Sequence, residues 1–302
     1  DFRSDPGAGL ALLQPAWQEF EDLMDGPGGL ALMAATTRCL GGLDRSDDQL
    51  AWAERALPLA ERLGEMETIV NVLAGRSSAI LRLGRPIEAR VLLEGAFQLA
   101  LTHDLQAVES RTRNLLVFYG QWDEPARALE LAREGQERAR RLGSRGYGYL
   151  MVGNGVSCAL RAGDWAWADE QLEEWLVDTT DIVGRLEFLV DRAILSALRG
   201  RDPSPDIESV TPALDRLSDP QYRSYEQLAR AWIALADGRL ADAASAGEEA
   251  VATTSFFTPI GLPVAARASL WDRDAVRAAR TLATLDASGY HGVAFAAVFA
   301  AF

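Results

Sequence analysis

The segment AGDWAWADEQLEEW, residues 162–175, combines the two residue types that a sugar-cleaving site would use. Trp165 and Trp167 could stack on sugar rings, and a pair of carboxylates could act as general acid and base. A glycosidase holds that pair at a set separation across a cleft, and this spacing singles out no such pair. We therefore expect Trp165, like Trp122 at the same repeat position, to pack between helices, whereas the places of Trp167 and Trp175 are less determined. Of the five carboxylates, which begin with Asp164, we expect four to form a mostly solvated face: Asp169, Glu170, Glu173 and Glu174.

A glycine-rich stretch, GYGYLMVGNG at residues 146–155, is a second chemical candidate. No strand pattern precedes it and no Gly-Lys-Ser/Thr follows, so it does not fit a phosphate-binding loop. We expect its glycines to allow close contact between helices. Tyr147 and Tyr149 are further candidates to face a binding groove.

The histidines and cysteines give no metal or nucleophile pattern. His103 and His291 have no ligand partner one helical turn away, and Asp104, next to His103, would point elsewhere on a helix. Both histidines are expected in loops. Cys39 and Cys158 lie far apart in apolar stretches, which favours buried thiols over a disulfide. We predict no catalytic, cofactor-binding or metal-binding residue.

An internal repeat sets the expected architecture. Glycines that end one helical pattern and precede another recur at intervals of 36, 43, 37 and 38 residues. Such intervals fit a helix, a tight turn, a second helix and a connecting loop. The glycines are Gly84, Gly120, Gly163, the degenerate copy Gly200, and Gly238.

Small and aliphatic residues follow each glycine at offsets that place them on one helical face, as Ala89, Leu93 and Ala96 do. Pro58 should kink or interrupt the helix in which it lies. Strand signals are nearly absent. We therefore predict an all-α solenoid of antiparallel helix pairs, about sixteen helices in a right-handed superhelix, forming one domain over residues 1–302.

Two copies of the repeat resemble the tetratricopeptide repeat. GDW at residues 163–165 is followed by Ala168, and GQW at residues 120–122 is followed by Pro125. The first helices lack the Trp-x-x-Leu-Gly opening of that family, and the intervals exceed its period of about 34 residues. The resemblance implies a tetratricopeptide-like superhelix.

An Ala-x-Arg-Leu-Gly ending, at residues 60–64 and 139–143, closes two of the second helices. With this longer period it resembles the helical arm of large bacterial signalling ATPases, which include LuxR-type regulators and ATPase-linked nucleotide cyclases. The resemblance spans residues 46–289. In that family an upstream ATP-binding module acts as the switch, and the helical arm receives an inducer or a partner. The resemblance implies that this chain is a noncatalytic scaffold that binds a protein, a peptide or a small effector.

Composition limits the classes of partner and the cellular location that we expect. The net charge of −14 repels phosphate backbones, so nucleic acid is a poor direct ligand. No apolar run is long enough for a membrane span and no signal-peptide pattern opens the chain, so we expect a cytoplasmic protein. The chain starts without Met and stops within the apolar pattern GVAFAAVFAAF, which favours a fragment of a longer protein.

The first helix of each pair should line the concave face, where repeat proteins bind partners. Counting back from the turn glycines places five residues there: Asn71, Ser78, Asn114, Ser157 and Tyr225. Two other functions stay open. One is an all-helical hydrolase acting on carbohydrate, and the other is a self-association module using the apolar C-terminal segment.

Overall fold

The computed structural model describes residues 5–178, 182–214, 220–252, 254 and 257–288. Within them all regular secondary structure is helical: fifteen α-helices and one short 3₁₀ helix. This confirms the predicted all-α class. The chain divides into two compact units, Asp1–Leu116 and Val117–Phe302, called unit 1 and unit 2 below.

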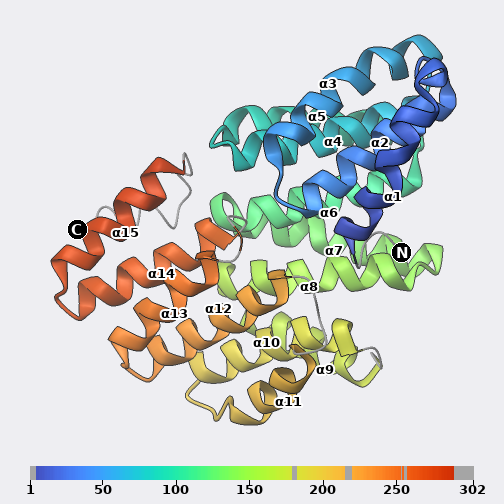
Figure 1. The fold of residues 1–302 in the computed structure, drawn as a ribbon. Coiled ribbons are helices and arrows are strands. Elements are labelled where there is room, and N and C mark those ends of the chain that lie inside the picture. Colours follow the sequence, from blue (N-terminus) through green and yellow to red (C-terminus); the bar gives the residue numbers. More distant parts are fainter. Residues whose placement is uncertain (1–4, 179–181, 215–219, 253, 255–256, 289–302) are drawn as a thin grey trace. The chain divides into compact units, whose positions relative to one another are not determined.

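Apart from the short η1, unit 1 is built from helices of 14 to 18 residues (Figure 1). Consecutive helices pack against each other, and α2 also contacts α4. Buried alanines such as Ala53 and Ala60 let these helices approach closely. The helices are α1 (Pro6–Glu19), η1 (Glu21–Leu23), α2 (Pro27–Gly42), α3 (Ser46–Leu63), α4 (Met66–Arg82), α5 (Pro86–Thr102) and the first part of α6 (Gln106–Asp123).

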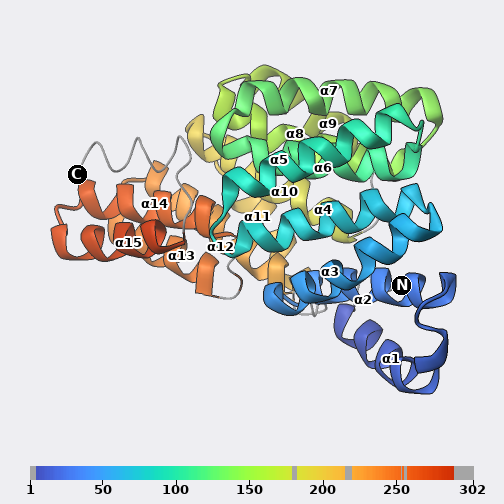
Figure 2. The ribbon, with the colours of Figure 1, turned by 90° about the horizontal axis from the view of Figure 1, so that it is seen from above.

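Unit 2 forms two layers. The helices α8, α10, α12 and α14 contact one another in that order, and α7, α9, α13 and α15 pack against them as hairpin partners. Figures 1 and 2 show α12 to α15 as antiparallel neighbours, the pairing of an α-solenoid. The bounds are α7 (Pro125–Leu142), α8 (Arg145–Ala162), α9 (Trp165–Asp178), α10 (Ile182–Leu198), α11 (Ser204–Leu214), α12 (Pro220–Ala236), α13 (Leu240–Ala252), α14 (Thr258–Trp271) and α15 (Ala275–Ala287).

Most of the repeat glycines occupy the turn position that the sequence predicts. Gly84, Gly163, Gly200 and Gly238 all have φ between 69° and 85°, the left-handed region that side chains with a Cβ rarely adopt. Each follows the end of a helix and reverses the chain. The degenerate copy at Gly200 is therefore a genuine turn.

Gly120 is an exception, and the prediction that it ends a helix is wrong. The helix α6 continues through it to Asp123, and α7 begins at Pro125. A Cβ on Gly120 would lie 3.0 Å from the Cβ of Ala128, so the missing side chain serves close packing of α6 on α7. The proline, which suits the first position of a helix, marks the start of the second helix instead.

The predicted packing face is confirmed. Ala89, Leu93 and Ala96 of α5 are all buried, as are Ala278 and Leu282 of α15. Of the two outcomes expected at Pro58, a kink or an interruption, the interruption does not occur, since α3 runs without a break from Ser46 to Leu63. Buried alanines and leucines on either side hold this helix against its neighbours, and tertiary packing outweighs the local cost of the proline.

Candidate binding site

The tryptophans of the 162–175 segment are packing residues. The edge of the Trp167 ring would lie 2.9 Å from a Cβ on Gly155, and that of Trp175 would lie 3.0 Å from one on Gly148. The glycine-rich stretch of α8 therefore seats two rings from α9, which confirms the close helix contacts predicted for it. Trp165 is also tied down, because its indole N–H donates to the carbonyl of Leu160 at 3.0 Å.

The carboxylates of this segment lie mostly at the surface. Glu170 and Glu173 are exposed, and Glu174 is an exposed partner of Arg140. Asp169 departs from the expected solvated face, because it is half-buried and pairs with Arg199. These carboxylates therefore form a charged surface with cross-helix ion pairs.

Three of the five residues predicted to line the groove belong to unit 1. Asn71 on α4 is half-buried and accepts a hydrogen bond from Arg111 at 2.8 Å. Ser78 is buried, and its hydroxyl donates to the carbonyl of Ala74. Asn114 on α6 is half-buried. Ser78 is thus engaged with its own helix, as serines within helices often are.

The other two predicted residues, Ser157 and Tyr225, come together in unit 2. Ser157 on α8 hydrogen-bonds to Asp191 on α10. The same Asp191 acts electrostatically on Tyr225 of α12. Three successive helices of one layer therefore contribute to one polar cluster.

A hydrogen bond between a tyrosine and a glutamate lies at the centre of this cluster. The hydroxyl of Tyr149 on α8 donates to Glu187 Oε2 on α10 at 2.8 Å. Burial, the charge of Glu187 and this bond together raise the pKa of Tyr149 well above its ordinary value. The phenol therefore keeps its proton and stays a donor. Its ring packs edge-on against Phe188, with 5.1 Å between ring centroids.

Asp191 lies one helical turn after Glu187 on α10 and is buried. Burial first, and then the neighbouring Glu187 carboxylate, raise the pKa of Asp191 to about 8, against the opposing effects of Arg161 and Ser157. At neutral pH Asp191 is therefore mainly protonated. Its hydroxyl gives the cluster a second buried proton donor beside the Tyr149 phenol.

Two tyrosines of α12 complete the cluster. Tyr222 and Tyr225 are both half-buried, and both act electrostatically on Tyr149. Burial, followed by the charges of Glu187 and Asp191, raises the pKa of Tyr225 well above its ordinary value. The Tyr225 ring meets Phe257 edge-on at 4.9 Å between centroids. We call Tyr149, Glu187, Asp191, Tyr222 and Tyr225 the tyrosine–carboxylate patch.

Sequence analysis found Tyr225 and considered Tyr149, but it missed the two carboxylates and Tyr222. A signal was present, because Glu187 and Asp191 interrupt the apolar run of α10 at a spacing of one turn. Tyr147, also considered for the groove, is buried in the core. It lies two residues from Tyr149 and therefore points to a different side of α8.

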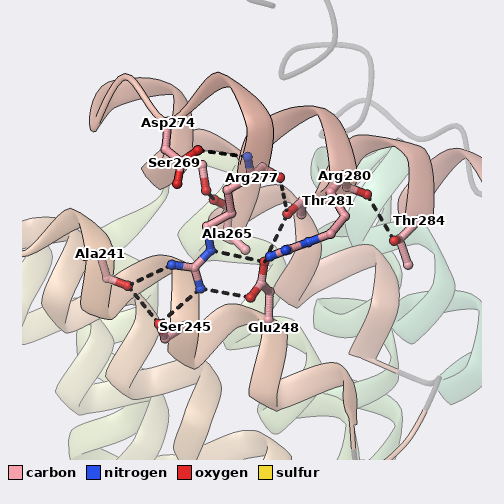
Figure 3. A network of polar contacts seen from close by, with 10 residues as sticks. All are labelled: Ala241, Ser245, Glu248, Ala265, Ser269, Asp274, Arg277, Arg280, Thr281 and Thr284. Carbon is pink, nitrogen blue, oxygen red and sulfur yellow. Dashed lines mark hydrogen bonds and ion pairs between the residues drawn. The ribbon is translucent and has the colours of Figure 1, made fainter.

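A second polar cluster ties α13 to α15 (Figure 3). Glu248 on α13 accepts from Arg277 at 2.8 Å and also from Arg280 and Thr281, all three on α15. Burial alone would raise the pKa of Glu248, but the bonds and charges of these partners outweigh it and hold the pKa below its usual range. Because both carboxylate oxygens have partners, this cluster joins neighbouring repeats and leaves no open acid for a ligand.

The remaining reactive side chains form no site. Cys39 and Cys158 are free and buried, as expected, and burial raises the pKa of Cys158 to about 12. His103 lies in the turn after α5, as predicted, whereas His291 lies outside the described residues. Within the part of the chain that the structure describes, no group of three His, Cys, Asp or Glu side chains could hold a metal ion.

No helix among the described residues combines the length and apolar character needed to cross a bilayer. The apolar C-terminal segment at residues 292–302, considered for self-association, lies outside the described residues.

No protein-family model matches this chain, and no curated protein matches it.

Proposed function

We propose that this chain is a noncatalytic scaffold that binds a segment of a partner protein through the tyrosine–carboxylate patch. The supporting observation is the convergence of α8, α10 and α12 on one half-buried cluster of phenols and carboxylates. Tyrosine rings offer broad apolar contact and a polar end with little loss of side-chain freedom, which is why binding surfaces use them.

The neighbouring groups suit a peptide backbone. Ser157 beside the patch carries a hydroxyl, and the phenols of Tyr222 and Tyr225 can each donate or accept a hydrogen bond. Stacked helical hairpins commonly present such groups to an extended partner segment. The sequence resemblance supports a setting in a cytoplasmic bacterial signalling or transcriptional regulator, as the arm that receives a partner or small effector.

The hydrolase alternative draws no support from the patch. Glycosidases place their two carboxylates on opposite sides of the scissile bond. Glu187 and Asp191 instead lie one turn apart on the same helix, and each is hydrogen-bonded to a side chain of α8. A direct assay of the purified chain on polysaccharides tests this alternative, and turnover that Glu187→Gln abolishes would establish it.

Peptide selection followed by tyrosine variants tests the scaffold proposal. Peptides are selected from a displayed random library on the immobilised full chain, and affinities are then measured by fluorescence anisotropy. We expect Tyr149→Phe and Tyr225→Phe to weaken a selected peptide about five- to tenfold each, because each loses a hydroxyl that positions the patch. Both changes keep the ring and so preserve packing against Phe188 and Phe257.

Tyr147→Phe is the matched control, since Tyr147 lies on the same helix but in the core. It should leave affinity within about twofold of the unmodified chain. Equal affinity for all three variants would contradict the proposal, because the peptide would then bind elsewhere.

A further inference from the structure

A groove opens in unit 2 between α11 and α13, with α12 as its floor. Its volume is about 510 Å³, within the range of ligand-binding clefts. The gap exists because α11 packs mainly on α10 and only lightly on α12. With 11 residues and Pro212 within it, α11 is shorter than its neighbours and leaves the adjacent side of α12 uncovered.

Apolar side chains from all three helices line part of the groove. Ile207 of α11, Ile233 and Ala234 of α12 and Ala246 of α13 all line it. Both isoleucines are half-buried and so present side-chain surface to the groove. An apolar side chain placed here would remove that surface from water, which contributes about 25 cal/mol for each Å² buried.

The walls of the groove carry uncompensated negative charge. Glu208 on α11 and Glu249 on α13 line opposite walls, are exposed, and form no ion pair or side-chain hydrogen bond with any described residue. The two arginines at the groove, in contrast, are neutralised. Arg230 bonds Glu226 at 2.7 Å, and Arg239 bonds an aspartate on either side of the α12–α13 turn.

We propose that this groove is a second binding site, for a partner-protein segment whose apolar side chains are flanked by arginine or lysine. The apolar side chains would cover Ile207 and Ile233, and the basic ones would face Glu208 and Glu249. A chain of net charge −14 also draws basic segments toward it over a longer range. This site uses α11, α13 and the C-terminal part of α12, and no residue of the tyrosine–carboxylate patch lines it.

The test uses the full chain and a defined probe. The probe is a short fluorescein-labelled peptide with two leucines one helical turn apart, each flanked by arginine. Two comparison peptides replace the leucines by serine or the arginines by glutamate. Anisotropy at low salt should show saturable binding of the probe and at least fivefold weaker binding of both comparison peptides.

Matched pairs of substitutions then locate the site. Glu208→Gln with Glu249→Gln should weaken probe binding about fivefold, because two exposed charge contacts are lost. Glu170→Gln with Glu61→Gln removes the same charge from exposed positions outside the groove and should leave binding within twofold. Tyr225→Phe should also leave it unchanged, which separates this site from the patch.

Three results would overturn the inference: no saturable binding of the probe, equal binding of the glutamate peptide, or equal losses in the two pairs of variants. The last result would mean that net charge alone attracts the probe. All four glutamates are exposed and form no ion pair or side-chain hydrogen bond with a described residue, so the variants should fold as the unmodified chain does.

Discussion

Asp191 shows how much a single side chain depends on its surroundings. It is buried beside another carboxylate, with the Ser157 hydroxyl as a hydrogen-bond partner. The sequence shows that Asp191 interrupts an apolar run one turn after Glu187, but it does not show that the two carboxylates are packed together and Asp191 buried. Its pKa of about 8 therefore follows from the packing of α8 on α10.

The raised pKa of Asp191 makes stability depend on pH with a definite sign. Between the ordinary aspartate pKa of 3.8 and about 8, the folded chain holds a proton that the unfolded chain has released. Because the folded state binds more protons, the free energy of unfolding falls as pH rises through this window. The stabilising effect is complete below the unfolded pKa and is lost above the folded one.

We predict that Asp191→Asn loses less stability than the unmodified chain between pH 5 and pH 8. The amide stays neutral throughout and can still bond to Ser157. Urea unfolding followed by circular dichroism at the two pH values measures the difference. The exposed variant Glu170→Gln should behave as the unmodified chain does, and an equal fall for Asp191→Asn would show that Asp191 is ionised in the folded state.

At the scale of elements, the sequence predicts the helices and most turns because periodicity and turn glycines are local properties. Gly163 and Gly238 stand where a left-handed residue is needed, and Ala89 and Leu93 face inward as their spacing requires. The prediction that Gly120 ends a helix is wrong because glycine serves two purposes. It can permit a turn or permit close approach, and only the position of α7 against α6 decides between them.

The backbones of α13 and α14 approach each other closely at Gly247 and Gly261. A Cβ on Gly261 would lie 2.6 Å from the carbonyl oxygen of Gly247, and backbone atoms cannot move aside as a flexible side chain can. We predict that Gly261→Ala lowers the free energy of unfolding of unit 2 by about 1–3 kcal/mol. Thermal or urea unfolding measures this loss.

Gly146→Ala in α8 is the control for this prediction, because no atom lies within 4 Å of the added Cβ. It should be neutral or slightly stabilising, since alanine restricts the unfolded chain more than glycine does. If Gly261→Ala were as stable as Gly146→Ala, the described contact of α13 with α14 would be incorrect.

At the scale of the whole molecule, the sequence predicts the all-α class well but identifies the binding groups poorly. A repeat period shows which helices share a layer, and this was enough to place Ser157 and Tyr225 on helices of one layer. It does not show how polar groups on successive helices align across that layer. Glu187 and the groove between α11 and α13 therefore emerge only from the packed structure.

The proposed role of this chain is binding through a site that several helices build together. The net charge of −14 disfavours nucleic acid as the direct partner. The proposed binding site is the tyrosine–carboxylate patch, which α8, α10 and α12 of one layer build together. We infer that a partner protein contacts the chain at this patch.

Site-specific photocrosslinking tests whether a partner protein contacts the patch. Benzoylphenylalanine replaces Tyr222 in the patch or, as a control, Val276 on α15, which is 80% exposed and lies in the other layer. Each full-length protein is irradiated in an extract of its source cells, and adducts are mapped by mass spectrometry. We expect one discrete protein adduct at position 222 that excess unmodified chain prevents, and none at position 276. No adduct at 222, or the same adducts at both positions, would contradict it.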